Sequence, residues 1–346
     1  DASSCVIIVN GGAISPLVML LTTGTSDVKR EASRALANLS LRSETTQLAI
    51  ASGLVTLIGS GSSIESQETI SQLILILVAD ATNLVAIAHA NAVPKLINQL
   101  RGQDVLPRGD YTSIRLQELA AAVLAHLCNA SDEALAHECV DRIASNENGI
   151  PFLLVLLSSD STIAQAQASS VISALARRSA LNKSTIVSEG CITPLVVLLT
   201  KPTHTPSAKA HAPLIFALGR EKGLTIPHAK AKAAGALLSL TTGQPETQKL
   251  VADAGAIKPL VALLGEPNDH ARMRAAGAIA SLCRDNTRNK NAFEKYSAID
   301  KLVELLNASS PDGVRAEVAT ALAVLTEENP ANKDKVAASG GIEQLN

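Results

Sequence analysis

The sequence predicts an all-α protein in which about seven repeats of three helices each stack into a solenoid. Three observations lead to this prediction. A ten-residue motif recurs along the 346-residue chain, its copies return about every 42 residues, and 47% of the residues are hydrophobic while only 1% are aromatic. A core of Ala, Leu, Ile and Val without Trp suits many thin helical layers better than one thick centre. A period of this length is typical of helical solenoids.

The recurring motif marks one helix of each repeat. Its clearest copies read GGAISPLVML at 11–20, GCITPLVVLL at 190–199 and GAIKPLVALL at 255–264. Two steps between copies are longer than the others, and they predict a loop insertion at 101–113 and a longer insertion with a possible extra helix at 201–227. The marker residues, in steps of 41, 38, 57, 42, 65, 42 and 43, are Ile14, Val55, Val93, Ile150, Ile192, Ile257, Ile299 and Ile342.

One repeat shows how three helices arise. Pro259 suits a first helical turn, where its missing N–H costs nothing, and Gly265 ends the apolar stretch that follows. The segment ARMRAAGAIASLC at 271–283 has Ala, Ile and Leu at helical spacing, and a short helix with Phe293 facing inward completes the repeat. Alanine in the long helix lets neighbouring repeats pack closely and share one continuous core.

The order of these motifs resembles the armadillo repeat. That pattern is GAIxPLVxLL, a polar break, an Ala-rich helix ending ALxNLS, then Asn-Lys and a short helix, and the resemblance covers nearly the whole chain. It implies a right-handed superhelix whose third, Ala-rich helices line a concave groove, and it disfavours the rival HEAT repeat. Because the chain starts and stops inside repeats, we expect 1–346 to be a single array within a longer protein.

Catalytic chemistry finds no support in the sequence. Phosphate-binding, dinucleotide-binding, zinc-protease and serine-hydrolase motifs are all missing, so we expect neither an enzyme nor a cofactor. His126, Cys128, His137 and Cys139 are metal-binding residue types. Residues two apart on a helix point roughly 200° away from each other, however, so we expect core cysteines, surface histidines and no metal.

The cellular setting is also predicted from composition. Five scattered cysteines without a C-x-x-C pair suggest small buried side chains in a reducing compartment. No apolar run reaches the roughly 18 residues of a membrane span, and the first residues lack a basic signal region. We expect a cytoplasmic protein, and the sequence leaves nuclear or cytoskeletal association and the oligomeric state open.

The resemblance points to groove residues on the third helices. In importin-α and β-catenin this helix carries an Asn, often with a Trp one turn earlier, and both hold an extended peptide. Here the Asn positions are Asn38, Ile76, His126, Ala174, Ser239, Ser281 and Val324, and the Trp positions are Arg34, Gln72, Ala122, Ser170, Gly235, Gly277 and Thr320. Only one Asn and no Trp remain at these positions, and their loss disfavours a nuclear import adaptor.

The small residues at these positions either admit a partner helix or reflect tight packing. The candidate groove residues are Arg34, Asn38, Gln72, His126, Ser170, Ser239, Ser281 and Thr320.

Charge is distributed unevenly along the chain. Residues 201–295 hold 14 Lys and Arg against 7 Asp and Glu, a net +7, while the whole chain is −2 and the rest is therefore −9. This asymmetry can steer an acidic partner segment, extended or helical, toward one region, although a solvated face would look the same. Nucleic acid is disfavoured because stacking aromatics are scarce. The candidate basic residues are Lys209, Lys230, Lys232, Arg272 and Arg274.

Together these features predict a non-enzymatic scaffold that binds a protein partner in its concave groove. Two alternatives remain. The stretch LLTTGTSDVKREASRALANLS at 20–40 is similar to armadillo repeats of plant-type U-box ligases, which suggests the substrate-binding region of a ubiquitin ligase. A structural subunit of a large cytoskeletal or ciliary assembly would use the same fold through its outer surface.

Overall fold

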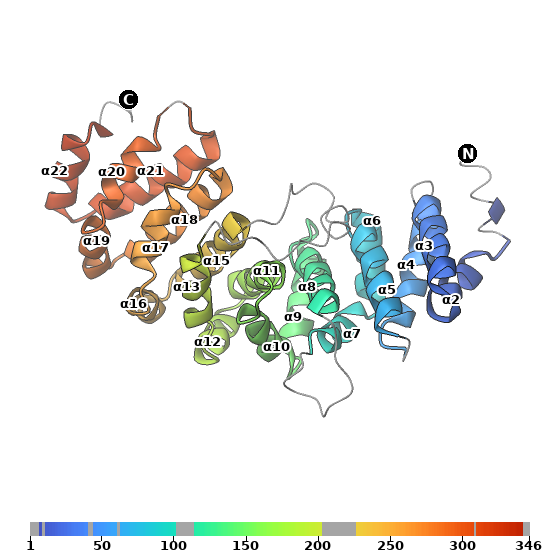
Figure 1. The fold of residues 1–346 in the computed structure, drawn as a ribbon. Helices are drawn as coiled ribbons and strands as arrows, with labels where there is room; N and C mark the ends of the chain where they lie inside the picture. The colour runs from blue at the N-terminus through green and yellow to red at the C-terminus, as the bar shows by residue number, and fades with distance from the viewer. Residues whose placement is uncertain are drawn as a thin grey trace. The chain divides into compact units, whose positions relative to one another are not determined.

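The computed structural model describes residues 7–8, 11–40, 44–60, 63–101, 114–202, 226–307 and 309–341. Within these ranges the regular structure is α-helical and no strand occurs, which confirms the predicted fold class (Figure 1). The two predicted insertions fall almost wholly outside the described residues, as does Lys209.

Three kinds of helix alternate along the chain, as the repeat predicted. The third, Ala-rich helices are α3 (Ser26–Ser40), α5 (Ile64–Leu77), α8 (Ile114–Cys128), α11 (Thr162–Arg178), α15 (Ile226–Thr241), α18 (Asp269–Cys283) and α21 (Asp312–Thr326). The second helices, with the recurring motif, are α2 (Ile14–Thr23), α7 (Ala92–Gln99), α10 (Gly149–Leu157), α13 (Ile192–Thr200), α17 (Ile257–Leu263) and α20 (Ala298–Glu304). The short first helices are α6 (Ala81–His89), α9 (Glu133–Ala144), α12 (Ala180–Ser188), α16 (Pro245–Asp253), α19 (Thr287–Glu294) and α22 (Pro330–Ala338).

One repeat departs from this pattern. Helix α4 (Glu44–Leu57) runs without a break where the other repeats have separate first and second helices. At several other corners a residue with positive φ ends the first helix, as at Gly190 (89°), Gly255 (88°) and Asn91 (63°), whereas none lies between α9 and α10. A left-handed residue stops a helix because its carbonyl and N–H no longer point along the helix axis. Gly53, inside α4, is not among the residues with positive φ, so the helix continues.

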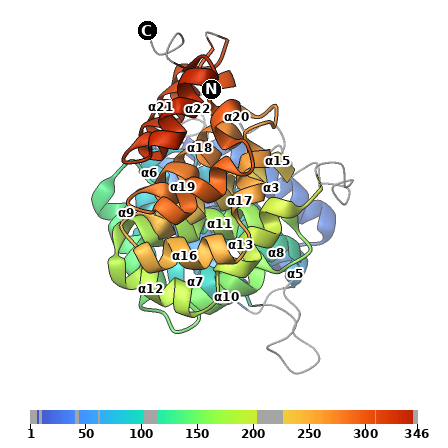
Figure 2. The ribbon, with the colours of Figure 1, turned by 90° about the vertical axis from the view of Figure 1, so that its left-hand side faces the viewer.

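The chain forms two compact units. The first holds α2 to α9 and most of α10, ending at Leu156, and the second holds α11 to α22. In the second unit α15 packs between α11 and α18, and α18 packs between α15 and α21. Figure 1 shows these third helices along one side of the second unit and the first helices α12, α16, α19 and α22 along the other; Figure 2 shows it turned by 90°.

Local sequence explains where the helices begin. The Asn268 side chain accepts a hydrogen bond from the Ala271 N–H at 2.9 Å and caps α18, and Asn286 caps α19 in the same way at 3.0 Å. Phe293 is fully buried, as predicted. Asn268 thus fixes the start of the long helix α18, and Asn286 fixes the corner at which the short helix α19 turns back against α18.

The predicted burial is observed for the four cysteines in the described residues, and Cys5 lies outside them. Cys128, Cys139, Cys191 and Cys283 are buried in the core and form no disulfide within the described ranges. Burial raises the pKa of Cys139 to about 11 and that of Cys191 to about 12, so both stay protonated and weakly reactive near neutral pH.

No single helix in the described part of the chain is long and apolar enough to cross a membrane. Among the described residues, α12 and α13 together are the only pair of helices long and apolar enough, and they are bent by 76° at their junction.

Candidate functional site

The third-helix face of the second unit, made by α11, α15, α18 and α21, is held together by hydroxyl groups. Ser239 Oγ lies 2.9 Å from Ser173 Oγ and donates to the Gly235 carbonyl at 2.9 Å. Ser281 Oγ lies 2.8 Å from Thr241 Oγ1. Ser239 and Ser281 are only 6% and 7% exposed. At these two predicted groove positions the small side chains join neighbouring helices.

Two glycines on this face make room for charged side chains of the next helix. A Cβ atom added to Gly235 would lie 3.5 Å from Arg274 Cδ, and one added to Gly277 would lie 3.1 Å from Glu317 Oε2. Arg274 therefore lies over Gly235, and Glu317 lies over Gly277. Both glycines are buried, whereas Arg274 and Glu317 are half-buried. The glycines stand where the resemblance places Trp, and long charged side chains cover them instead.

The predicted basic residues divide by what they contact. The Lys230 ammonium is buried and lies 3.4 Å from Glu266 Oε1, and Arg272 pairs with Asp269 at 3.1 Å. Arg274 makes no hydrogen bond or ion pair in the described part of the chain. Lys232 is half-buried and precedes Gly235 by three residues, just as Arg274 precedes Gly277. Lys232 and Arg274 thus occupy equivalent positions on neighbouring third helices.

Two histidines extend this basic stretch by one turn. His228 on α15 and His270 on α18 stack with ring centroids 6.1 Å apart and an interplanar angle of 29°. They precede Lys232 and Arg274 by four residues, so they lie on the same helix faces. Sequence reasoning missed this pair because only the alignment of two neighbouring helices brings the rings together.

The remaining groove candidates belong to different units. Arg34, Asn38 and His126 are exposed on α3 and α8 of the first unit. Gln72, also in the first unit, accepts a hydrogen bond from Arg115 Nη2 at 3.4 Å. In the second unit Ser170 is half-buried and Thr320 is exposed, and the Thr320 hydroxyl donates to the carbonyl of residue 316 at 3.0 Å.

Some lysines are used inside the fold, and one of them, Lys290, belongs to the charge count of 201–295. Lys290 Nζ donates to the Glu327 carbonyl at 2.6 Å, and Lys183 Nζ donates to the Thr242 carbonyl at 2.8 Å. Both lysines follow the Asn of an Asn-Lys motif in a first helix, and both carbonyls lie just beyond the end of the next third helix. An ammonium group there complements the negative end of the helix dipole. The net charge of 201–295 therefore overstates the charge available to a partner.

The asparagines of the Asn-Lys motif make a second set of repeated hydrogen bonds, which sequence reasoning missed. Asn289 Nδ2 donates to the Leu282 carbonyl at 2.8 Å, and Asn332 Nδ2 donates to the Leu325 carbonyl at 2.8 Å. Each buried amide ties a first helix to the end of the preceding third helix, seven residues back. The recurrence of Asn-Lys was visible in the sequence, but the bonded carbonyl was not.

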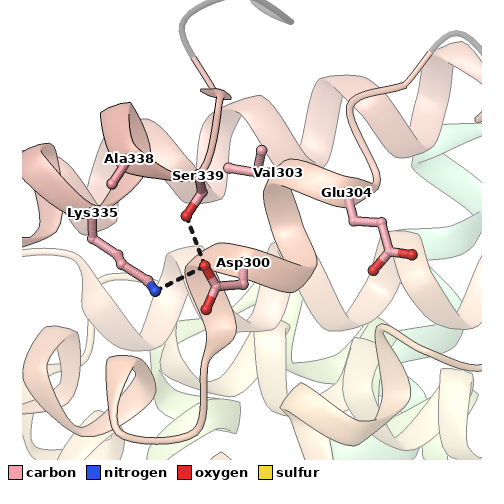
Figure 3. A pocket seen from close by; sticks show the side chains of 6 residues that line it. All are labelled: Asp300, Val303, Glu304, Lys335, Ala338 and Ser339. Carbon is pink, nitrogen blue, oxygen red and sulfur yellow. Dashed lines mark hydrogen bonds and ion pairs between the residues drawn. The ribbon is translucent and has the colours of Figure 1, made fainter.

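A pocket of about 370 Å³ lies between α20 and α22 (Figure 3). Asp300 accepts a hydrogen bond from Ser339 Oγ at 2.7 Å and pairs with Lys335 Nζ at 3.0 Å. These two contacts hold the pKa of Asp300 below its ordinary value, whereas burial raises the pKa of nearby Glu294. A carboxylate with a lowered pKa is a weak general base, so Ser339 is poorly activated as a nucleophile. The trio acts as a polar contact between two helices.

The predicted separation of cysteines and histidines is also seen. Cys128 and Cys139 are buried, while His126 and His137 are exposed. Across the described ranges, no three His, Cys, Asp or Glu side chains converge in a way that could hold a metal ion.

Comparison with known proteins agrees with this architecture. The Armadillo/beta-catenin-like repeat model matches residues 6–41 and 244–284. An engineered protein of known structure aligns with 100% of this chain and 86% of its own, with a TM-score of 0.60 and 26% identity. A designed armadillo repeat protein aligns with 80% of this chain and 99% of its own, with a TM-score of 0.59 and 21% identity.

A further designed armadillo repeat protein, solved in complex with the peptide (KR)4, aligns with 90% of this chain and 99% of its own. Its TM-score is 0.52 and its identity 18%. No curated protein matches the sequence significantly. The matched segments coincide with α2 and α3 and with α16 to α18, which carry the recurring motifs. These two segments are therefore similar in sequence to armadillo repeats, and the chain as a whole shares its fold with designed armadillo repeat proteins.

Proposed function

We propose that this chain is a non-enzymatic scaffold that holds a segment of a partner protein against its third helices. The observation that carries the proposal is Arg274, whose guanidinium stays without a charged partner in the described residues while its stem lies over Gly235. An arginine fixed in this way is ready to pair with a partner's carboxylate, because little side-chain entropy is lost on binding.

The comparisons support the class of ligand. A designed armadillo repeat protein of similar fold has been solved with a bound peptide. That peptide is basic by its printed composition, whereas Arg274 offers positive charge here. The partner chemistry proposed for this part of the face is therefore acidic, on grounds of charge complementarity.

The structure selects which basic residues to test. Lys230 and Arg272 are engaged with Glu266 and Asp269, so reversing their charge would disturb the fold as well as a binding face. Lys232 and Arg274 share one face and are half-buried. Lys249 on α16 and Lys258 on α17 are exposed on other helices and provide a matched pair with the same change of charge.

The test is quantitative affinity capture from a lysate of the source organism with three proteins. These are the unchanged chain, Lys232→Glu/Arg274→Glu and Lys249→Glu/Lys258→Glu. We expect the Lys232/Arg274 variant alone to lose a stoichiometric partner with an acidic segment, and a synthetic copy of that segment to bind the unchanged chain directly. Equal partner lists from all three proteins, with equal circular dichroism, would remove the third-helix face as the contact.

Substrate binding within a ubiquitin ligase and a structural role in a large assembly stay predictions from the sequence, as does a cytoplasmic location. The same capture separates them. Ubiquitin-conjugating enzymes among the partners lost with Lys232→Glu/Arg274→Glu would favour the ligase. Partners lost only with Lys249→Glu/Lys258→Glu would favour assembly through the outer helices.

A further inference from the structure

We propose that the third-helix face of the second unit recognises a partner segment of mixed charge. An acidic side chain of that segment pairs with Arg274, and a basic side chain of the same segment pairs with Glu317. The inference rests on the proposed function, because it assumes that this face holds a partner segment, and it specifies which segment the face selects.

Arg274 and Glu317 are two steps of one repeated arrangement. Each lies one turn before the position that the resemblance assigns to Trp, which is Gly277 on α18 and Thr320 on α21. Each also lies over a buried glycine of the preceding third helix, as the added Cβ distances of 3.5 Å to Arg274 Cδ and 3.1 Å to Glu317 Oε2 show. The two charged groups are therefore placed by the same packing, one repeat apart.

Neither charge is neutralised by the fold. Both side chains are half-buried, and neither makes a hydrogen bond or ion pair with any described residue. The other charged groups near the start of these helices are paired within their own helix, as Arg272 with Asp269 and Arg315 with Asp312. The charge pattern offered to a partner is thus positive at α18 and negative at α21. A buried stem with an available charged head is the arrangement that aids selective pairing.

Geometry sets the spacing of the complementary charges. Neighbouring packed helices lie about 8–10 Å apart, and a segment in the polyproline II conformation advances about 3.1 Å per residue and turns once every three residues, so that side chains three residues apart point the same way. The acidic and basic side chains of the partner segment are therefore about three residues apart. A purely acidic segment would place a second carboxylate against Glu317, and a purely basic one would place a second cation against Arg274. Like-charge contacts of this kind oppose binding.

The test measures fluorescence anisotropy of short labelled peptides with the full chain at low ionic strength. The peptides share an Ala/Ser background and carry Asp and Lys about three residues apart in either order, or two Asp, or two Lys, at the same positions. We expect the unchanged chain to bind one of the mixed peptides about threefold to tenfold more tightly than either like-charged peptide.

Two variants then move the preference in opposite directions. Glu317→Lys is expected to favour the two-Asp peptide, and Arg274→Glu is expected to favour the two-Lys peptide. Glu317→Gln, a milder change, is expected to remove the penalty on the two-Asp peptide. The matched controls Glu246→Lys and Lys249→Glu, exposed on α16, are expected to keep the preference of the unchanged chain.

The outcomes separate this inference from the proposed function. If the unchanged chain prefers the two-Asp peptide and Glu317→Lys leaves that preference as it was, the mixed-charge inference is wrong while peptide binding stands. If the chain binds a natural partner through Arg274 but ranks all four peptides equally, charge order is not what the face selects. If no peptide binds and no partner depends on Arg274, both proposals are overturned.

Discussion

The most informative single residue for stability is the buried Asn of the Asn-Lys motif. In α19, the Asn289 amide donates to the Leu282 carbonyl at 2.8 Å, while its backbone N–H donates to the Asn286 cap at 3.0 Å. One side chain thereby satisfies a carbonyl near the end of α18, a position that otherwise lacks an intrahelical donor. The Asn332 amide in α22 donates to the Leu325 carbonyl in the same way, so this contact recurs in more than one repeat.

We expect Asn289→Ala to lower the free energy of unfolding by about 1–3 kcal/mol, because it leaves a buried carbonyl without a donor. Urea unfolding followed by circular dichroism measures this change. Asn98→Ala is the matched control, since Asn98 is exposed on α7 and its loss should cost little. Equal effects of the two substitutions would show that the Asn289 contact contributes no more than a surface amide.

The sequence predicts that such residues recur from repeat to repeat, but it does not predict which groups they contact. Counting charges placed Lys230 among the basic candidates, yet its ammonium pairs with Glu266, 36 residues further along the chain. Lys290 shows the same limit, because its acceptor is a backbone carbonyl of Glu327. Pairing of this kind depends on how consecutive repeats stack, and local pattern carries no information about which residues then meet.

Among the helices, α15, α18 and α21 have buried glycines, Gly235 and Gly277, at the contacts between them. Glycine inside a helix costs about 0.5–1 kcal/mol relative to alanine, so a buried glycine needs a packing reason. The reason differs in degree between the two positions. An added Cβ at Gly235 meets Arg274 at an ordinary contact distance of 3.5 Å, but one at Gly277 meets Glu317 Oε2 and Leu238 Cδ2 at 3.1 Å.

We therefore expect Gly235→Ala to stabilise the protein by up to about 1 kcal/mol, and Gly277→Ala to gain less or to destabilise, because two neighbours must shift. Thermal unfolding of both variants beside the unchanged chain measures the order, with Gly235→Ala highest. A larger gain for Gly277→Ala would mean that the close approach of α21 to α18 does not restrict this position.

The helices also show how far sequence predicts an armadillo repeat. The long helix predicted at 271–283 is observed as α18, and the short helix with Phe293 inward is observed as α19, so apolar spacing and turn residues predicted both. The unbroken helix α4 was not, because several of the corners between first and second helices depend on a left-handed residue, as at Gly255 or Asn91. The presence of Gly53 in the sequence does not reveal which conformation that glycine adopts.

At the scale of the whole molecule, the way helices pack within each unit determines how far a local loss of stability spreads. In the second unit each third helix packs against its sequential neighbours, α15 against α11 and α18, and α18 against α15 and α21. Stability in such arrays is approximately a sum of repeat terms and nearest-neighbour terms. A defect in one repeat should therefore weaken that repeat and the adjoining ones more than distant ones.

Leu282→Ala tests this expectation, since Leu282 is fully buried in α18 and its truncation should cost about 2–5 kcal/mol. We expect amide hydrogen exchange to accelerate in α18 and α19, less in α15 and α21, and to stay unchanged in α5 to α9 of the first unit. Leu250→Ala, at an exposed position on α16, serves as the control. Uniform acceleration across both units would instead mean that the chain opens as one cooperative body, and local strengthening of the third-helix face would then stabilise every repeat equally.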